Sequence, residues 1–220
     1  MRPFVFINAA MSLDGKISNE RRERVKISTR EDFEIVDRLR AESDAVMVGI
    51  GTILADNPRL TVKSEKLREE RVKKGKQPNP IRVIVDSRAR TPPNARVLNN
   101  EAETIIAVSK IADEERIEKL KEKADVIVLG DERVDLKALL GYLYRRGVRK
   151  LMVEGGSELN ASLIRERLVD EVRVFYSGMI IGGASAPTLV GGRSFDPPIR
   201  AELKSYEVLG NGVAITWKIK

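Results

Sequence analysis

The sequence predicts an α/β protein with a mixed, mostly parallel sheet that ends in an antiparallel hairpin. Apolar segments of strand length alternate with amphipathic segments of helical spacing through most of the 220 residues. This alternation is typical of parallel strands joined by helices. The last two strand-like segments instead follow one another directly and meet at Asn211-Gly212, a frequent hairpin sequence.

Strands are predicted from apolar runs that are rich in β-branched residues and bounded by turn residues. The first of them, FVFINAAMS, has the continuous apolar character of a buried strand. The predicted strands are 4–12, 45–50, 81–87, 104–109, 125–130, 150–156, 171–178, 201–210 and 212–220.

Helices are predicted where apolar residues recur at three- and four-residue spacing. At the start of 28–43, Ser28 and Glu31 match a capping box, which supplies acceptors to the unpaired N–H groups of the first turn. Gly147 is expected to end a later helix in the left-handed conformation. Further helices are predicted over 52–56, 113–124, 135–147 and 157–168.

Cysteine and histidine are both absent. Their absence excludes disulfides, thiolate nucleophiles, histidine triads and Cys/His zinc sites, and no metal site is expected. Any chemistry must rest on carboxylates, Lys, Arg, hydroxyls, backbone groups or a bound cofactor. Charged residues make up 33% of the chain and are rich in Lys, Arg and Glu, a composition that resembles that of thermophiles.

The net charge of +7 is compatible with two classes of anionic partner, nucleic acid and phosphorylated small molecules. The most basic stretch, 63–80, interleaves its Lys and Arg with glutamates and has no aromatic residue to stack on bases. We therefore expect a solvated helix and loop there, and no binding of nucleic acid.

No apolar run reaches the roughly 18 residues that a membrane-spanning helix needs. The opening stretch MRPFVFINAAMSLDGK has a short apolar run that meets Asp14 and Lys16, so a first strand is expected in place of a signal peptide. Because no linker or repeat is visible, residues 1–220 are expected to form a single domain, located in the cytoplasm.

The stretch MVEGGSELN places two glycines between a predicted strand and a predicted helix. Glycine lets the backbone approach a phosphate closely, and the N–H groups that open a helix bind anions. Three other strand ends carry glycine or small polar residues: VGIGT (48–52), VDSRA (85–89) and LGDE (129–132). Because ligands of parallel sheets bind at the carboxyl ends of strands, four such ends favour a dinucleotide. The Rossmann and P-loop glycine motifs are absent.

A second informative stretch is GIGTILADNPRLTVK, residues 49–63. Thr52 is expected to cap the short helix. The following loop is expected to cluster Asp56, Asn57, Arg59 and Lys63. A cationic loop beside a dinucleotide site suggests a second anionic ligand. The alternative is a plain capped turn that Asn-Pro ends.

Together these stretches resemble the reductase of riboflavin biosynthesis, a stand-alone protein in archaea and fungi and half of a bifunctional deaminase/reductase in many bacteria. The matching segments cover nearly the whole chain: NAAMSLDGKI (8–17), LRAESDAVMVGIGTILADNPRLTV (39–62), VIVDS (83–87), VEGGSELNASLI (153–164) and IIGGASAPTLVGG (180–192). The resemblance implies a dihydrofolate-reductase-like fold, a three-layer α/β sandwich with a mixed sheet, and a homodimer.

The activity that the resemblance implies is NADPH-dependent reduction of 2,5-diamino-6-ribosylamino-4(3H)-pyrimidinone 5′-phosphate to the ribitylamino product, by hydride transfer to C1′. The bifunctional relatives deaminate the pyrimidine at a zinc site that needs His and Cys, which this chain lacks. The diamino form is therefore the expected substrate, with the deaminated form left open.

The resemblance and the strand-end glycines together indicate two sets of binding residues. The cofactor set is Gly49, Thr52, Asp56, Ser87, Arg88, Gly130, Gly155, Gly156, Ser157, Glu158 and Leu159. The substrate set is Asn8, Ser28, Arg40, Leu60, Lys63 and Glu154, of which Ser28, Arg40 and Lys63 suit the 5′-phosphate. The family often has lysine in place of Asn8 and arginine in place of Lys63. The second difference keeps the charge but loses the bidentate fork.

Asp56 and Glu154 are the candidate catalytic carboxylates. The nicotinamide cofactor carries out the hydride chemistry, and the protein supplies position and electrostatics. We hypothesise that one of these carboxylates, partly buried, stabilises a protonated imine at C1′ or moves a proton. For Glu154 the alternative is a strand-end carboxylate that binds helix N–H groups.

The segment DSRAR (86–90) bears on the choice of cofactor. Ser87, Arg88 or Arg90 is expected to hold the 2′-phosphate of NADPH, which predicts a preference for NADPH, with NADH left open as a second cofactor. The glycine-rich segment 180–192 is expected to be a mobile loop that borders the site.

Two other functions stay open at this point. A dihydrofolate-type reductase shares the fold and the cofactor, but its substrate has no 5′-phosphate for Arg40 and Lys63 to bind. A basic nucleic-acid-binding protein would show salt-dependent binding and would have no use for the strand-end glycines.

Overall fold

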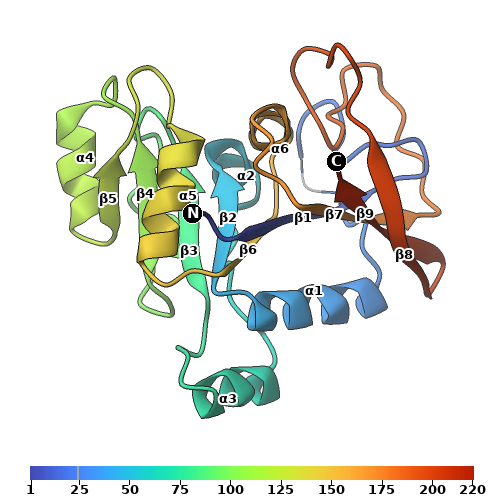
Figure 1. Ribbon diagram of the computed structural model, residues 1–220, viewed down its shortest axis with the longest axis horizontal. Coiled ribbons are helices and arrows are strands. Elements are labelled where there is room, and N and C mark those ends of the chain that lie inside the picture. Colours follow the sequence, from blue (N-terminus) through green and yellow to red (C-terminus); the bar gives the residue numbers. More distant parts are fainter. Residues whose placement is uncertain (24) are drawn as a thin grey trace. The chain divides into compact units, whose positions relative to one another are not determined.

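The computed structural model (Figure 1) describes residues 1–23 and 25–220. The chain divides into two compact units. Unit 1 comprises Met1–Pro3 and Asp37–Met152, and unit 2 comprises Phe4–Val36 and Val153–Lys220.

Unit 1 is built on parallel strands. Across the sheet their order is β5 (Asp125–Val128), β4 (Thr104–Val108), β3 (Ile81–Val85), β2 (Ala45–Gly49) and β6 (Lys150–Val153). The pairs β2/β3, β3/β4 and β4/β5 are all parallel. Every residue of β4 is buried, as expected for a strand that is covered on both faces.

The helices of unit 1 follow its strands: α2 (Ile50–Asp56), α3 (Glu65–Lys73), α4 (Glu114–Lys121) and α5 (Leu136–Arg145). α4 and α5 begin at Asp113 and Asp135, whose carboxylates accept hydrogen bonds of 2.9 Å and 2.8 Å from the first-turn N–H groups of Arg116 and Ala138. The predicted helix end at Gly147 is confirmed, since this residue has a φ of +90°.

The basic stretch 63–80 contains the predicted helix, which is α3. The prediction that this stretch is solvated is wrong at Arg71. This side chain is buried and donates to the carbonyls of Ala41, Ser43 and Gln77 at 2.6, 2.7 and 2.9 Å. Burial lowers the pKa of Arg71. Carbonyls at the C-terminal end of a helix lack intrahelical partners, and Arg71 supplies donors to them.

Unit 2 carries the antiparallel part of the fold. Its strand order is β1 (Phe4–Met11), β7 (Glu171–Ser177), β9 (Gly212–Ile219) and β8 (Ala201–Leu209). β1 and β7 pair in parallel, whereas β9 pairs antiparallel with β7 and with β8. The predicted mostly parallel arrangement with a C-terminal antiparallel hairpin is therefore confirmed (Figure 1).

The hairpin turn lies one residue earlier than its sequence signal. The two turn residues are Gly210, with a φ of +60°, and Asn211, while Gly212 is already the first residue of β9. A Cβ atom on Gly212 would lie 2.3 Å from Cζ of Phe175. Glycine is therefore needed at this position for the close packing of β9 on β7.

Two helices frame unit 2: α1 (Arg30–Glu42), which carries the chain from unit 2 into unit 1, and α6 (Ser157–Arg165). The predicted cap of α1 at Ser28 is wrong by one residue. The hydroxyl of Thr29 accepts from the N–H of Asp32 at 3.3 Å, in the position of the cap.

Among residues 1–23 and 25–220, no helix has the length and apolar character needed to cross a bilayer.

Candidate active site

The end of β2 and the helix α2 that follows it hold three residues of the predicted cofactor set. Gly49 is the N-cap of α2 and has extended backbone, with φ −81° and ψ 158°. Thr52 lies inside the helix, so its predicted role as the cap is wrong. Asp56 is the last helical residue and is exposed, which contradicts the partial burial expected of a proton-moving carboxylate there.

The segment after α2 brings together three residues of the predicted substrate set. A guanidinium N–H of Arg40 donates to the carbonyl of Thr61 at 3.0 Å. Thr61 lies directly after Leu60 and two residues before the exposed Lys63. This contact between α1 and the loop helps to group Arg40, Leu60 and Lys63 in unit 1.

Leu60 offers a ligand its backbone only. Its side chain is 2% exposed and belongs to the core, which decides between the two modes of contact that the sequence left open. Its φ of +55° lies in the left-handed region, which is uncommon for a residue that carries a Cβ. Such strained residues concentrate at functional sites.

Asp37 was not among the predicted site residues, yet it orients this loop. Its carboxylate accepts the N–H of Lys63 at 2.7 Å and the N–H of Ser64 at 2.8 Å. Asp37 and Arg40 lie one turn apart on α1 and hold the loop at either end. The sequence signal that could have found this residue is its spacing, since Asp37 follows Phe33 by four residues and so falls on the apolar face of the predicted helix.

The end of β3 is tied to the turn after β5. The hydroxyl of Ser87 accepts the N–H of Val134 at 3.1 Å. Gly130 has a φ of +84°, and a Cβ on it would lie 2.2 Å from the carbonyl oxygen of Arg133, so only glycine fits this turn. The structure thus brings Ser87 and the segment after Gly130 together, while Arg88 is exposed.

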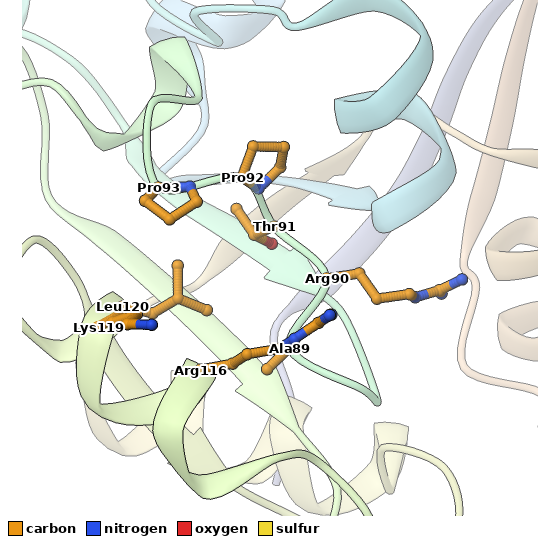
Figure 2. Close-up of a pocket in the computed structure, with 8 residues that line it drawn as sticks. All are labelled: Ala89, Arg90, Thr91, Pro92, Pro93, Arg116, Lys119 and Leu120. Atoms are coloured by element: carbon orange, nitrogen blue, oxygen red, sulfur yellow. The ribbon is translucent and has the colours of Figure 1, made fainter.

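A pocket of about 390 Å³ lies next to this strand end. Figure 2 shows its lining residues, which come from the 89–93 segment and from α4: Ala89, Arg90, Thr91, Pro92, Pro93, Arg116, Lys119 and Leu120. The side chain of Arg90 extends away from Lys119 and Leu120 (Figure 2). Its Nε lies 3.6 Å from Oδ1 of the fully buried Asp86, so Arg90 is tied to the end of β3.

The two glycines that precede α6 include one with left-handed backbone. Gly155 has a φ of +107°, which favours glycine, and the Gly155–Gly156 peptide bond is cis. Gly156 is the N-cap of α6 and provides no side-chain cap for the first-turn N–H groups. Glu154, directly before the pair, is half-buried. Of the two candidate catalytic carboxylates, Glu154 is therefore the one that shows the expected partial burial.

The first turn of α6 contains the last three residues of the predicted cofactor set, whose backbone N–H groups can donate to a ligand. Leu159 is buried, so its side chain serves the core. Glu158 is exposed and Ser157 half-buried. Within unit 2, the first-turn N–H groups of α6 and the left-handed Gly155 before them form a donor set whose chemistry fits the phosphates of a dinucleotide. In unit 1, the hydroxyl of Ser87 is a further polar group at a strand end.

The glycine-rich segment 180–192 has no regular secondary structure and is held by hydrogen bonds within unit 2. Asp14 accepts the N–H groups of Ile181 and Gly182 at 3.0 Å and 2.7 Å. At the other end, the N–H of Gly191 donates to the carbonyl of Ser157 at 3.1 Å. The segment therefore touches the first turn of α6.

Asn8 lies in a buried polar cluster that the sequence did not reveal. Its Oδ1 accepts an N–H of Arg173 at 2.8 Å, and Arg173 also donates to Asp32 at 3.0 Å. Arg173 interrupts the apolar strand EVRVFYS, and a cation in such a strand is the signal that could have indicated the cluster. Ser28 lies half-buried just before Thr29.

The comparison with known families agrees with this arrangement. The model of the RibD C-terminal domain family matches residues 3–215. The chain belongs to the RibD C-terminal domain family. A relative in Archaeoglobus fulgidus, named 2,5-diamino-6-ribosylamino-4(3H)-pyrimidinone 5′-phosphate reductase, is 59% identical over 98% of each chain.

Two solved structures support the fold of this RibD-type chain. A pyrimidine reductase-like protein from Corynebacterium diphtheriae superposes with a TM-score of 0.88 at 20% identity, covering 99% of this chain and 92% of that one. A dihydrofolate reductase from Enterococcus faecalis, solved with NADP(H), gives 0.53 at 12% identity over 98% and 96%. The predicted dihydrofolate-reductase-like fold is confirmed. Membership in this family of reductases makes the chain an oxidoreductase and implies a nicotinamide cofactor.

Proposed function

We propose that the protein reduces 2,5-diamino-6-ribosylamino-4(3H)-pyrimidinone 5′-phosphate to its ribitylamino product in riboflavin biosynthesis, with NADPH as reductant. The observation that carries the proposal is the 59% identity, over 98% of both chains, to the Archaeoglobus fulgidus reductase of that name. Family membership favours this reaction over a dihydrofolate-type reduction. The bound cofactor would supply the hydride that reduces C1′ of the substrate.

The substrate phosphate would be held by positive charge in unit 1. Arg40 lies against the loop at Thr61, and Lys63 is exposed on the same loop. The family resemblance also assigns Ser28, in unit 2, to the 5′-phosphate. Because a phosphate dianion attracts nearby cations strongly, Arg40 and Lys63 would contribute both affinity and orientation.

The cofactor would be held largely by backbone groups. The first-turn N–H groups of α6 and the glycines before it would bind phosphate oxygens, since a helix N-terminus attracts anions. In unit 1, Gly49, Thr52, Ser87 and Gly130 lie at strand ends, where ligands of parallel sheets bind. Arg88 or Arg90 would hold a 2′-phosphate, which would favour NADPH over NADH.

Glu154 is the better placed of the two candidate catalytic carboxylates. It is half-buried at a strand end, whereas Asp56 is exposed. A carboxylate with restricted access to water interacts more strongly with a nearby cation than an exposed one does. Glu154 would therefore stabilise a protonated nitrogen of the substrate or exchange a proton with it, and Asp56 would position the cofactor.

Three further assignments complete the proposal. The two units would act together as one reductase domain, and the functional protein would be a homodimer. Small phosphorylated molecules, and not nucleic acid, would be its partners, because carboxylates pair with many of the surface cations, as in Lys119–Glu115 and Lys121–Glu118. A cytoplasmic location stays a prediction.

The decisive experiment has a binding step and a turnover step. The protein is titrated with NADPH and with NADH by nucleotide fluorescence, and then supplied with the diamino substrate while loss of the reduced nicotinamide is followed. We expect tight binding of NADPH, weaker binding of NADH, and turnover. Gly156→Val should weaken NADPH binding by roughly tenfold or more, because the added side chain occupies the space of the phosphates.

Gly141→Val is the matched control. Gly141 lies in α5, outside the proposed site, and a Cβ there would meet only Nη1 of Arg145, at an ordinary 3.6 Å. Glu154→Gln should lower turnover by roughly a hundredfold if Glu154 handles a proton. Absence of NADPH binding and of turnover in the wild-type protein would refute the proposed function, and normal turnover by both Glu154→Gln and Asp56→Asn would remove the carboxylate roles.

A further inference from the structure

A buried arginine of β7 lies directly against the proposed substrate residue Asn8. The two residues are register partners in the parallel pairing of β1 with β7, so their side chains project from the same face of the sheet. Asn8 is 6% exposed and Arg173 is 8% exposed. A guanidinium N–H of Arg173 reaches Oδ1 of Asn8 at 2.8 Å.

This contact determines which way the amide of Asn8 points. A guanidinium carries only donors, so it can face only the acceptor end of the amide, Oδ1. The donor end, Nδ2, must then point away from Arg173. Within residues 1–23 and 25–220, Nδ2 makes no hydrogen bond and is not one of the fully buried polar atoms without a partner, so it is accessible to an acceptor from a ligand.

Arg173 is itself held in place by a second buried group. Asp32 of α1, 1% exposed, accepts another guanidinium N–H at 3.0 Å and balances the charge. The N–H of Asp32 is bonded in turn to the hydroxyl of Thr29, at the start of the helix. The chain of contacts therefore runs from the start of α1 through Asp32 and Arg173 to the amide of Asn8.

We propose that Arg173, held by Asp32, is a positioning residue that keeps the Nδ2 donor of Asn8 directed at an uncharged acceptor oxygen of the substrate. The inference rests on the proposed function and adds two residues to it. The hydrogen bond from the guanidinium also polarises the amide, which makes Nδ2–H a stronger donor. Arg173 and Asp32 do not touch the substrate themselves.

The test separates positioning from stability through a mutant cycle. Asn8→Ala removes the donor, and Arg173→Met with Asp32→Asn removes the buried pair without leaving an unpaired charge. Each change should lower kcat/KM for the pyrimidine substrate by about tenfold to a hundredfold, which corresponds to loss of one well-oriented hydrogen bond. The combined variant should be no worse than Asn8→Ala alone, because both changes remove the same interaction.

Two further variants sharpen the result. Asn8→Asp keeps an acceptor toward Arg173 but replaces Nδ2 by an oxygen, so it should lose the same tenfold to hundredfold in kcat/KM. Arg30→Met is the matched control, because the Arg30 side chain is 89% exposed and pairs only with Glu34 on the same helix among the described residues. It should retain full activity.

Thermal melting and NADPH affinity are measured on every variant. Retained NADPH affinity together with the non-additive loss of kcat/KM supports the proposal. Additive losses, or losses that only follow the melting temperature and the NADPH affinity, would overturn it, as would full activity of Asn8→Ala. If the wild-type protein binds NADPH but does not turn over the pyrimidine, the proposed function has failed. This result is obtained without the variants, so it is distinguishable from failure of the positioning role.

Discussion

The carboxylate of Asp14 shows how much one exposed residue can organise. It accepts the Ser12 hydroxyl at 2.6 Å and the N–H groups of Ile181 and Gly182 at 3.0 and 2.7 Å. These hydrogen bonds, that of Ser12 above all, lower the pKa of Asp14 from 3.8 to about 2. These donors stabilise the ionised carboxylate of Asp14. Through them, Asp14 connects the 180–192 segment to the residues that follow β1.

The lowered pKa of Asp14 predicts that the stability contributed by these hydrogen bonds depends on pH. Because the pKa of Asp14 is lower in the folded than in the unfolded chain, its ionised form stabilises the folded state above pH 3.8, and the contribution disappears as the pH falls to about 2. Asp14→Asn should therefore melt below the wild type near neutral pH, and the two should converge near pH 2. Thermal melting across pH measures this.

Glu132→Gln serves as the control, because Glu132 is exposed and lies in the turn after β5. Amide exchange at Ile181 and Gly182 adds a local readout, since Asp14→Asn should expose these two N–H groups. A melting difference that persists unchanged to the lowest pH would show that the Asp14 carboxylate is not the titrating group.

At the scale of elements, α1 acts as the support of the loop that carries Leu60 and Lys63. Asp37 accepts two loop N–H groups and Arg40 donates to a loop carbonyl. From α3, Arg68 donates to two loop carbonyls, both at 2.9 Å. The loop is therefore ordered by side chains that belong to helices on either side of it in sequence.

Asp37→Ala should weaken both the fold and the substrate site. Loss of two charge-assisted hydrogen bonds should lower the free energy of unfolding by about 2–4 kcal/mol. Because Lys63 is then poorly placed, KM for the phosphorylated substrate should rise severalfold while the affinity for NADPH changes little. Urea unfolding and steady-state kinetics measure the two effects.

Asp113→Ala is the matched control for this change. Asp113 caps α4 through a 2.9 Å bond from the N–H of Arg116, and its loss should cost about 1 kcal/mol without any change in KM. An equal rise in KM in both variants would mean that the effect is general destabilisation and not loop orientation.

At the scale of the whole molecule, β8 leaves apolar side chains exposed on the last strand of its sheet. Leu203, Tyr206 and Val208 are 55%, 71% and 72% exposed. Tyr206 and Val208 are two residues apart in the strand, so their side chains lie on the same face of the sheet. Natural proteins usually cover an apolar edge strand, which supports the proposal of a homodimer that uses β8.

If the proposed dimer forms through β8, Tyr206→Glu combined with Val208→Glu should convert it to a monomer, because two buried carboxylates on each subunit would oppose association. Light scattering at micromolar concentration measures the mass. Leu54→Glu, at a position in α2 that is 53% exposed, should remain a dimer. A monomeric wild-type protein would reject the homodimer, and a dimeric double variant would reject β8 as its interface.

The sequence by itself determined the elements and the glycine turns. The order of strands and helices, the final hairpin, the end of α5 at Gly147 and the glycine pair before α6 depend on propensities and periodicities within a few residues. Such local signals also misplaced the caps at Ser28 and Thr52, because several residues near a helix start compete for the cap and only packing selects one.

The tertiary structure alone decided which distant side chains meet. Arg173 lies 165 residues from Asn8 and 141 from Asp32 in the chain, and only the pairing of β1 with β7 and the position of α1 bring the three together. The burial of Arg71 and of the Leu60 side chain was decided in the same way. Contacts between residues far apart in sequence depend on strand order and register, which no short window of sequence encodes.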